Sequence, residues 1–154
     1  MDPLQPLASL LEQTRAERDL AFGDHLRLRR AAEAAQAQAE QLAGYRGDYA
    51  RRFGGSFQRS GALELMQCYQ GFMTRLDDAV AQQQRTVAQA AERADAARAT
   101  LLAAELRVAS VEKLVERRRA EASLAQQRRE QKAGDELAAR MSWQRGTAAA
   151  LGGW

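Results

Sequence analysis

Apolar residues recur at alternating steps of three and four in the second half of the chain, which is the spacing of a coiled-coil seam. Only Gln83 is polar among the fifteen a and d positions of this heptad frame. A period of 3.5 residues sustained for about seven heptads indicates a coiled coil rather than one side of a globular core. The a positions are Met66, Met73, Val80, Val87, Ala94, Leu101, Val108 and Val115, and the d positions are Tyr69, Leu76, Gln83, Ala90, Ala97, Ala104 and Val111.

The first half of the chain carries a weaker version of the same pattern. Its a positions include Arg18, His25 and Arg46, which suit a seam poorly. We therefore expect loose or partly hydrated pairing there. The a series is Leu4, Leu11, Arg18, His25, Ala32, Ala39 and Arg46, and the d series is Leu7, Thr14, Ala21, Leu28, Ala35, Leu42 and Tyr49.

Helix-breaking residues divide these two patterns. Pro3 and Pro6 fall near the start, where a helix tolerates proline, and the next cluster of breakers is the stretch RRFGGSFQRSG at residues 51–61. We read this stretch as the corner of a hairpin whose phenylalanines, Phe53 and Phe57, cap the seam. The prediction is one coiled-coil domain over 1–154, with helix one at about 4–52, the corner at about 53–61, helix two at about 62–142 and a frayed tail at 143–154.

The corner also predicts how the helices align. If it centres near residue 57, the numbers of antiparallel partners add up to about 114, so Leu4 meets helix two near residue 110. The apolar seam of helix two fades just after Val115. The predicted fold is all-α, a long antiparallel two-helix coiled coil, or helical hairpin. Its C-terminal helix overhangs by about 25–30 residues, roughly 40 Å at 1.5 Å per residue.

Composition narrows the functional classes. The 23 basic residues are nearly matched by 20 acidic ones, so the net charge of +3 gives no dominant basic surface for nucleic acid. An ion-paired, solvated helical face explains the charges better. Cys68 is the only cysteine, which excludes an internal disulfide and suits a reducing cytoplasm. We see no signal peptide at the start and no apolar run long enough to span a membrane.

No group of residues resembles an active site. A phosphate-binding loop needs a preceding strand and a Gly-Lys-Ser/Thr ending, and the glycine stretch has neither. His25 is the only histidine and lies at a seam position, while Cys68 lies at an outer heptad position. Neither has partners at the spacing that catalysis or metal binding requires. We expect no enzyme activity, no cofactor and no metal.

One edge of each helix near the corner carries an informative pattern. Gln38, Leu42, Tyr45 and Tyr49 step by four, three and four, and so do Phe72, Leu76, Ala79 and Gln83. Both sets occupy g and d positions, and Tyr45 and Phe72 lie beside the seam rather than in it. This edge is either a wider core near the corner or a docking patch of amphipathic aromatic residues for a partner protein.

The other end of the hairpin differs in character. Residues 112–143 mix arginines with glutamates and then place Leu137, Met141 and Trp143 on or near one face. Ion pairs within the helix would explain the charges but not the exposed apolar residues. A charged single helix of this kind suits insertion into a protein ring or groove.

Two runs resemble a known family. CYQGFMTRLDDAVAQQQ at 68–84 and VEKLVERRRAEASLAQQRREQKAGDELAAR at 111–140 look like the flagellar export protein family FliJ. The resemblance covers nearly the whole chain and rests on Tyr-x-x-Phe-x-x-x-Leu after the break, together with a late Gln-Lys-x-x-Asp-Glu.

The resemblance implies a non-enzymatic stalk of the bacterial flagellar type III export apparatus, similar to the central shaft of rotary ATPases. It implies three partners: the hexameric export ATPase, the cytoplasmic domain of the export gate, and export chaperones. It also implies a cytoplasmic protein peripherally associated with the inner-membrane apparatus, without insertion into the membrane. Two alternatives are the equivalent stalk of a virulence injectisome and, from another class, a basic coiled coil associated with nucleic acid.

The resemblance also implies two sets of site residues. The gate-contacting set is Gln38, Leu42, Tyr45, Tyr49, Phe72, Leu76, Ala79 and Gln83. The set that enters the ATPase ring is Leu4, Leu7, Leu11, Arg117, Arg118, Arg128, Arg129, Asp135 and Glu136.

Overall fold

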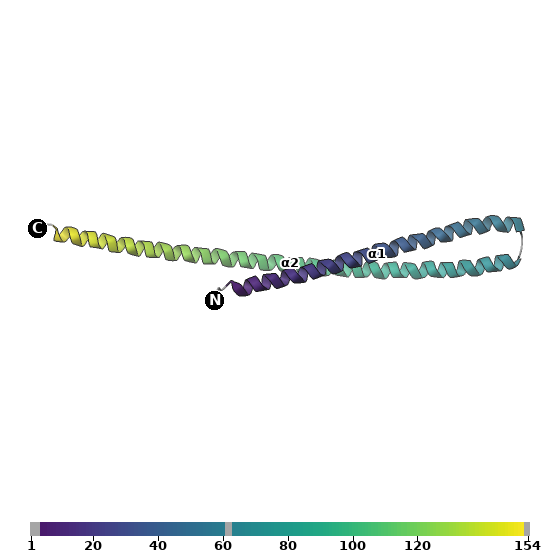
Figure 1. The fold of residues 1–154 in the computed structure, drawn as a ribbon, viewed down its shortest axis with the longest axis horizontal. Coiled ribbons are helices and arrows are strands. Elements are labelled where there is room, and N and C mark those ends of the chain that lie inside the picture. The colour runs from purple at the N-terminus through teal and green to yellow at the C-terminus, as the bar shows by residue number, and fades with distance from the viewer. Residues whose placement is uncertain (1–3, 61–62, 153–154) are drawn as a thin grey trace. The chain divides into compact units, whose positions relative to one another are not determined.

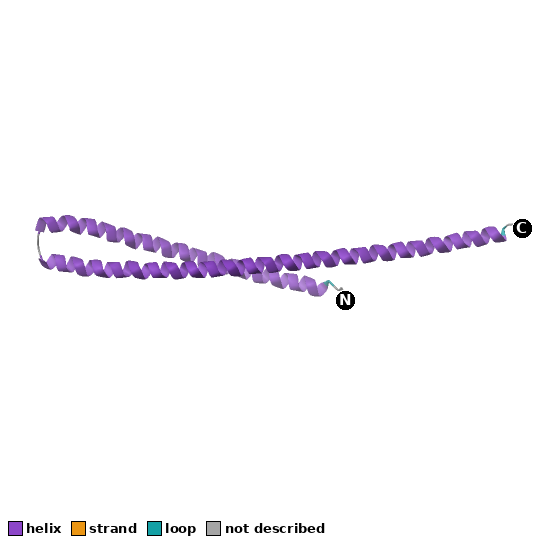
Figure 2. Ribbon diagram, turned by 180° about the vertical axis from the view of Figure 1, so that it is seen from behind, coloured by secondary structure: helices purple, strands orange, loops and turns teal. Residues whose placement is uncertain are grey.

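Two long α-helices account for the fold. The structure is a computed structural model that describes residues 4–60 and 63–152, with the backbone alone for 55–60. Helix α1 runs over Gln5–Ser60 and α2 over Leu63–Leu151 (Figure 1). No strand occurs within the described residues, all but a few of which are helical (Figure 2). The predicted all-α helical hairpin is confirmed.

The composition of the chain explains why both helices are so long. Ala, Leu, Arg, Gln and Glu dominate, and these residues lose little on entering a helix. Pro6 lies in the first turn of α1, where its missing N–H has no helical acceptor to lose. The amide of Ala8 donates to the carbonyl oxygen of Leu4 at 2.9 Å, so the hydrogen-bonded ladder begins at once.

The helix ends differ from the predicted ones. α1 continues to Ser60 instead of ending near residue 52, and α2 reaches Leu151, so most of the predicted frayed tail is helical. A glycine inside a helix destabilises it by about 1 kcal/mol relative to alanine. Gly54 and Gly55 both carry this cost, but α1 continues through them. In the tail, the run of alanines at 148–150 favours helix, and the Thr147 hydroxyl donates to the Trp143 carbonyl oxygen at 2.7 Å.

The chain divides into two compact units, each built from parts of both helices. We call Arg15–Leu106 the corner unit, and Met1–Thr14 with Arg107–Trp154 the terminal unit. The prediction of a single domain stays a prediction, and the units are described separately below.

Within the corner unit the two helices lie side by side and antiparallel (Figure 1). The numbers of contacting residues add up to 121 for Tyr49 and Phe72, and to 118 for Ala35 and Gln83. The predicted value of 114 is therefore wrong by about seven residues, which is one heptad. The cause is the extension of α1 through Gly54 and Gly55, which moves the turn toward Leu63.

The burial of the side chains confirms the heptad frame at all but three of its seam positions. Of the fifteen seam positions predicted in α2, only Met66 is exposed, and the others are buried or half-buried. In α1 the seam positions are likewise buried or half-buried except Arg46 and Tyr49. When one helix is displaced by seven residues, its a and d positions still face a and d positions of the other helix. The assignment of residues to the seam is therefore correct, although the predicted alignment of the two helices is wrong by one heptad.

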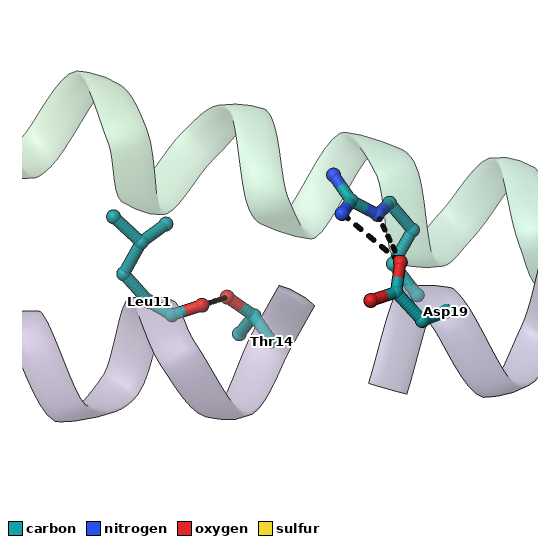
Figure 3. A network of polar contacts seen from close by, with 4 residues as sticks. Leu11, Thr14 and Asp19 are labelled. Carbon is teal, nitrogen blue, oxygen red and sulfur yellow. Dashed lines mark hydrogen bonds and ion pairs between the residues drawn. The ribbon is translucent and has the colours of Figure 1, made fainter. Parts of the chain in front are cut away.

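Two polar residues at the seam of α1, Thr14 and Arg18, find partners within their own helix. Thr14 is only 3% exposed, and its hydroxyl donates to the carbonyl oxygen of Leu11 at 2.9 Å (Figure 3). Arg18 directs its guanidinium to the carboxylate of Asp19, with Nη2 at 3.0 Å from Oδ1. Such local bonds satisfy a polar group at a seam without help from the facing helix.

In the terminal unit, burial along α2 stops where the sequence predicted. Val108, Val111 and Val115 are buried, whereas every residue from 116 to 151 is exposed apart from half-buried Ala125. This segment covers 36 residues, or about 54 Å of helix, longer than predicted because α2 continues to Leu151. The overhanging C-terminal helix is therefore present.

The packing of Leu101 leads to a stability prediction. This side chain is 9% exposed and clusters with Ala21 and Ala104, so Leu101→Ala should lower the free energy of unfolding by about 2 kcal/mol. The adjacent Leu102 is 57% exposed, and Leu102→Ala should change the free energy of unfolding by less than about 0.5 kcal/mol. Urea titration followed by circular dichroism at 222 nm measures both, and equal losses would contradict the assigned seam.

Candidate partner-docking edge near the helical corner

The eight residues predicted to form one edge are brought together in the corner unit. The side-chain amide of Gln83 donates to Oε1 of Gln38 at 3.3 Å, which fixes one end of the edge. At the other end the rings of Tyr49 and Phe72 meet edge to face, with centroids 5.0 Å apart and planes at 62°. We call this strip the aromatic edge; its members are Gln38, Leu42, Tyr45 and Tyr49 of α1 and Phe72, Leu76, Ala79 and Gln83 of α2.

A single register relates all four pairs of the aromatic edge. The numbers of Gln38 and Gln83 add up to 121, as do those of Tyr49 and Phe72. Leu42 with Ala79 and Tyr45 with Leu76 give the same total, so they occupy the turns between the two observed contacts. Residues spaced by four, three and four stay on one side of each helix, and the edge is continuous along the pair.

Exposure divides the aromatic edge into a supporting and a surface layer. Leu42, Leu76, Ala79 and Gln83 are half-buried, as expected for residues in or next to the seam. Tyr45 is 54% exposed and Tyr49 is 37% exposed, so their rings lie at the surface. Phe72, which the heptad frame placed beside the seam, is half-buried because its ring packs against Tyr49.

Two further aromatic rings, those of Phe53 and Tyr69, extend the edge toward the corner. Phe53 stacks on Tyr49 with centroids 6.1 Å apart, and it contacts Tyr69 of α2 at 5.1 Å. Aromatic pairs at such distances contribute beyond the area that they bury. The predicted capping of the seam by Phe53 agrees with these contacts, whereas the side chain of Phe57 lies outside the described residues.

Gln83 explains why the seam of α2 contains one polar residue. Its Nε2 donates to the backbone carbonyl oxygen of Ala35 at 3.0 Å, across the interface between the helices. Leaving a half-buried amide without partners would cost free energy, so this bond favours the observed register over registers that lack it. A polar residue at a d position was the signal in the sequence, but its acceptor, a backbone oxygen, has no sequence signature.

An ion pair joins the helices on the other side of the seam. Arg46, predicted to be a poor seam residue, leaves the seam and hydrogen-bonds through Nε to Asp77 of α2. This hydrogen bond and the charge of Asp77 raise the pKa of Arg46 above its ordinary value. Both side chains are about half exposed, so the pair contributes little stability but favours one alignment of the helices.

The residues predicted to enter a protein ring all lie in the terminal unit. Leu4, which precedes α1, and Leu7 and Leu11 within it are half-buried. The charged residues of α2 are all exposed: Arg117, Arg118, Arg128, Arg129, Asp135 and Glu136. Leu137, Met141 and Trp143 are exposed beside them, with Trp143 at 74%.

The remaining candidate residues show no arrangement for catalysis or metal binding. Cys68 is exposed. The Nδ1 atom of His25 is buried, and none of the described residues hydrogen-bonds to it. Within the described part of the chain no three His, Cys, Asp or Glu residues gather as metal ligands, and neither helix there is apolar enough over a sufficient length to cross a bilayer.

Comparison with known proteins gives one family match. A family model described as flagellar FliJ protein matches residues 3–147, and thus covers both halves of the aromatic edge and most of the overhanging helix. No curated protein and no solved structure matches the chain.

The contact between Tyr49 and Phe72 should appear as an energetic coupling. A double-mutant cycle with Tyr49→Ala and Phe72→Ala should give about 0.5–1.5 kcal/mol, because either substitution alone removes the ring pair. Phe22→Ala serves as the matched control partner for Phe72→Ala, since Phe22 is exposed and lies about 40 Å along α1 from Tyr49. Both cycles are measured by urea unfolding. If the effects of Tyr49→Ala and Phe72→Ala on the free energy of unfolding add up as fully as those of the control pair, the contact between the two rings is refuted.

Proposed function

This chain belongs to the flagellar FliJ family, and from that premise we propose that it is a non-enzymatic stalk and adaptor of the flagellar type III export apparatus. The family places it among flagellar export-associated proteins. In the proposed role the chain joins the hexameric export ATPase to the cytoplasmic domain of the export gate, and it also contacts export chaperones.

The observation that carries this proposal is the continuity of the aromatic edge. A contiguous strip along the helix pair, with tyrosines at the surface and aliphatic residues behind them, matches the composition of protein-binding hot spots. Tyrosine buries a large ring at a low entropic cost and keeps a hydroxyl for a hydrogen bond. We assign this edge to the export gate.

The overhanging helix supports a second contact, with the ATPase ring. A single helix that buries almost nothing is only marginally stable by itself, so a partner that covers Leu137, Met141 and Trp143 would gain apolar contact and order the segment. Arginines and glutamates on its other faces allow charge pairing with a surrounding wall. We assign this segment, with the start of α1, to the central opening of the export ATPase.

The proposed location is the cytoplasm, peripherally associated with the inner-membrane export apparatus through these protein contacts. Membership in a flagellar family favours the flagellar system over the injectisome alternative. The nucleic-acid alternative is disfavoured because several arginines are already paired with carboxylates, as in Arg29 with Glu33 at 3.2 Å and Arg27 with Asp24 at 3.4 Å. Nucleic-acid binding would require an affinity for DNA that falls steeply with salt.

The gate contact is tested by removing the two rings that flank the seam. Tyr45→Ala combined with Phe72→Ala should weaken binding to the cytoplasmic domain of the gate at least tenfold, since central aromatic residues dominate such interfaces. Isothermal calorimetry measures the Kd, and circular dichroism checks that helicity is kept.

A matched control is Phe22→Ala with Leu102→Ala, which removes two exposed apolar side chains of the same unit elsewhere. This control should bind like the unmodified chain. If the edge variant also binds within twofold of it, the aromatic edge is not the gate contact.

The ATPase contact is tested by truncation. Removal of residues 126–154 leaves every buried and half-buried position intact, so the rest of the chain should fold. The shortened chain should lose most of its stimulation of the export ATPase, at least fivefold, in a phosphate-release assay. Full stimulation would show that the part of the overhang from residue 126 onward is not needed for contact with the ring.

A further inference from the structure

We propose that the corner unit has a second register, in which α1 is displaced along α2 by one heptad and the aromatic edge is taken apart. The displacement corresponds to about 10 Å, or seven residues at 1.5 Å each. In this register the numbers of facing residues add up to about 114 instead of 121. The functional part of the inference, that the register controls gate docking, rests on the function proposed above.

The first support is the periodicity of the seam. In the observed register Gln83 reaches Ala35, so the next seam residue along α2, Val87, also lies beside Ala35. After a displacement of one heptad, Val80 takes the place of Val87. Ala35 is buried, and Val80 and Val87 are half-buried, so all three are seam residues. In the displaced register the other seam positions of the unit also face seam positions.

The second support is the small size of the seam side chains. Alanine occupies eight of the 22 seam positions of the unit, so a displacement by one heptad meets little steric hindrance at those positions, although it separates Leu101 from Ala21. Within the corner unit the seam alanines are Ala21, Ala32, Ala35 and Ala39 of α1 and Ala90, Ala94, Ala97 and Ala104 of α2.

The third support is a pair of glycines that the observed register does not use. Gly54 and Gly55 lie inside α1, where they weaken the helix, and a Cβ at Gly54 would meet nothing within 4 Å. In the displaced register the corner centres near residue 57, so both glycines fall at the end of α1, where glycine is favoured. A displacement the other way would centre the corner near residue 64, among Leu63, Leu65 and Met66.

A few contacts near the corner favour the observed register over the displaced one. They are the Gln83–Ala35 hydrogen bond, the Arg46–Asp77 ion pair and the Tyr49–Phe72 ring pair, and all three break together in the displaced register. A partner that binds across the aromatic edge contacts both helices and therefore holds them in the observed register. A partner that separates these contacts releases α1 to the other register.

Disulfide trapping tests for the second register. In a full-length Cys68→Ser background, Ala35→Cys with Val87→Cys reports the observed register and Ala35→Cys with Val80→Cys the displaced one. Ala35→Cys with Ala94→Cys is the matched control, one heptad in the opposite direction. Monomeric cross-linked chain is quantified by non-reducing electrophoresis after mild oxidation.

The Val87 pair should cross-link fastest, and the Val80 pair should cross-link at least ten times faster than the Ala94 pair. Equal rates for the Val80 and Ala94 pairs would overturn the proposal. Adding Gly54→Ala should slow the Val80 pair about fivefold and leave the Val87 pair unchanged, because alanine favours the longer α1. No change in the Val80 rate would contradict the role given to the glycine.

The two cross-linked chains then test the control of docking. The chain locked through Val80 should bind the gate domain at least tenfold more weakly than the chain locked through Val87, and equal binding would refute that control. Loss of binding in both chains would contradict the proposed gate contact instead. In that case the cross-linking rates alone would decide whether the second register exists.

Discussion

The alignment of α1 with α2 in the corner unit is the constraint on which its surfaces depend. The seam brings the helices together, but its heptad period by itself allows alignments at intervals of seven residues. Gln83, Arg46 with Asp77, and Tyr49 with Phe72 select one of these alignments. The same selection assembles the aromatic edge, whose four pairs exist only at a single register. The same few contacts thus determine both the register and the continuity of the aromatic edge.

Two paired helices provide long contact surfaces, because most of the described residues outside the seam are exposed. The corner unit offers aromatic rings backed by aliphatic residues, and the terminal unit offers a helix with mixed charges and exposed Leu137, Met141 and Trp143. These surfaces differ enough in chemistry to bind different partners.

Much of this architecture could be predicted from the sequence because the heptad pattern is a local signal. It identified the seam of α2 correctly except at Met66, and it placed the last buried residue at Val115. Spacing alone placed Tyr45 beside the seam, where its ring is exposed, whereas Tyr49 was assigned to the seam and is also exposed, and Phe72 was assigned beside the seam and is half-buried. The register was missed by one heptad, since a repeating pattern contains no absolute alignment and the glycines suggested an earlier turn. The hydrogen bond from Gln83 to a backbone oxygen and the ion pair of Arg46 with Asp77 depend on that alignment, and they could not be predicted without it.

The small seam side chains also affect how the protein responds to temperature. None of the described large side chains is fully buried, and alanine and valine occupy 13 of the 29 seam positions. Unfolding therefore exposes little apolar surface per residue, and its heat-capacity change per residue falls below the 12–15 cal/mol/K that is typical of compact domains, roughly in proportion to that surface. A small heat-capacity change flattens the stability curve. The helix pair should consequently keep a similar, modest stability from cold to warm growth conditions, and lose it gradually rather than at a sharp melting point.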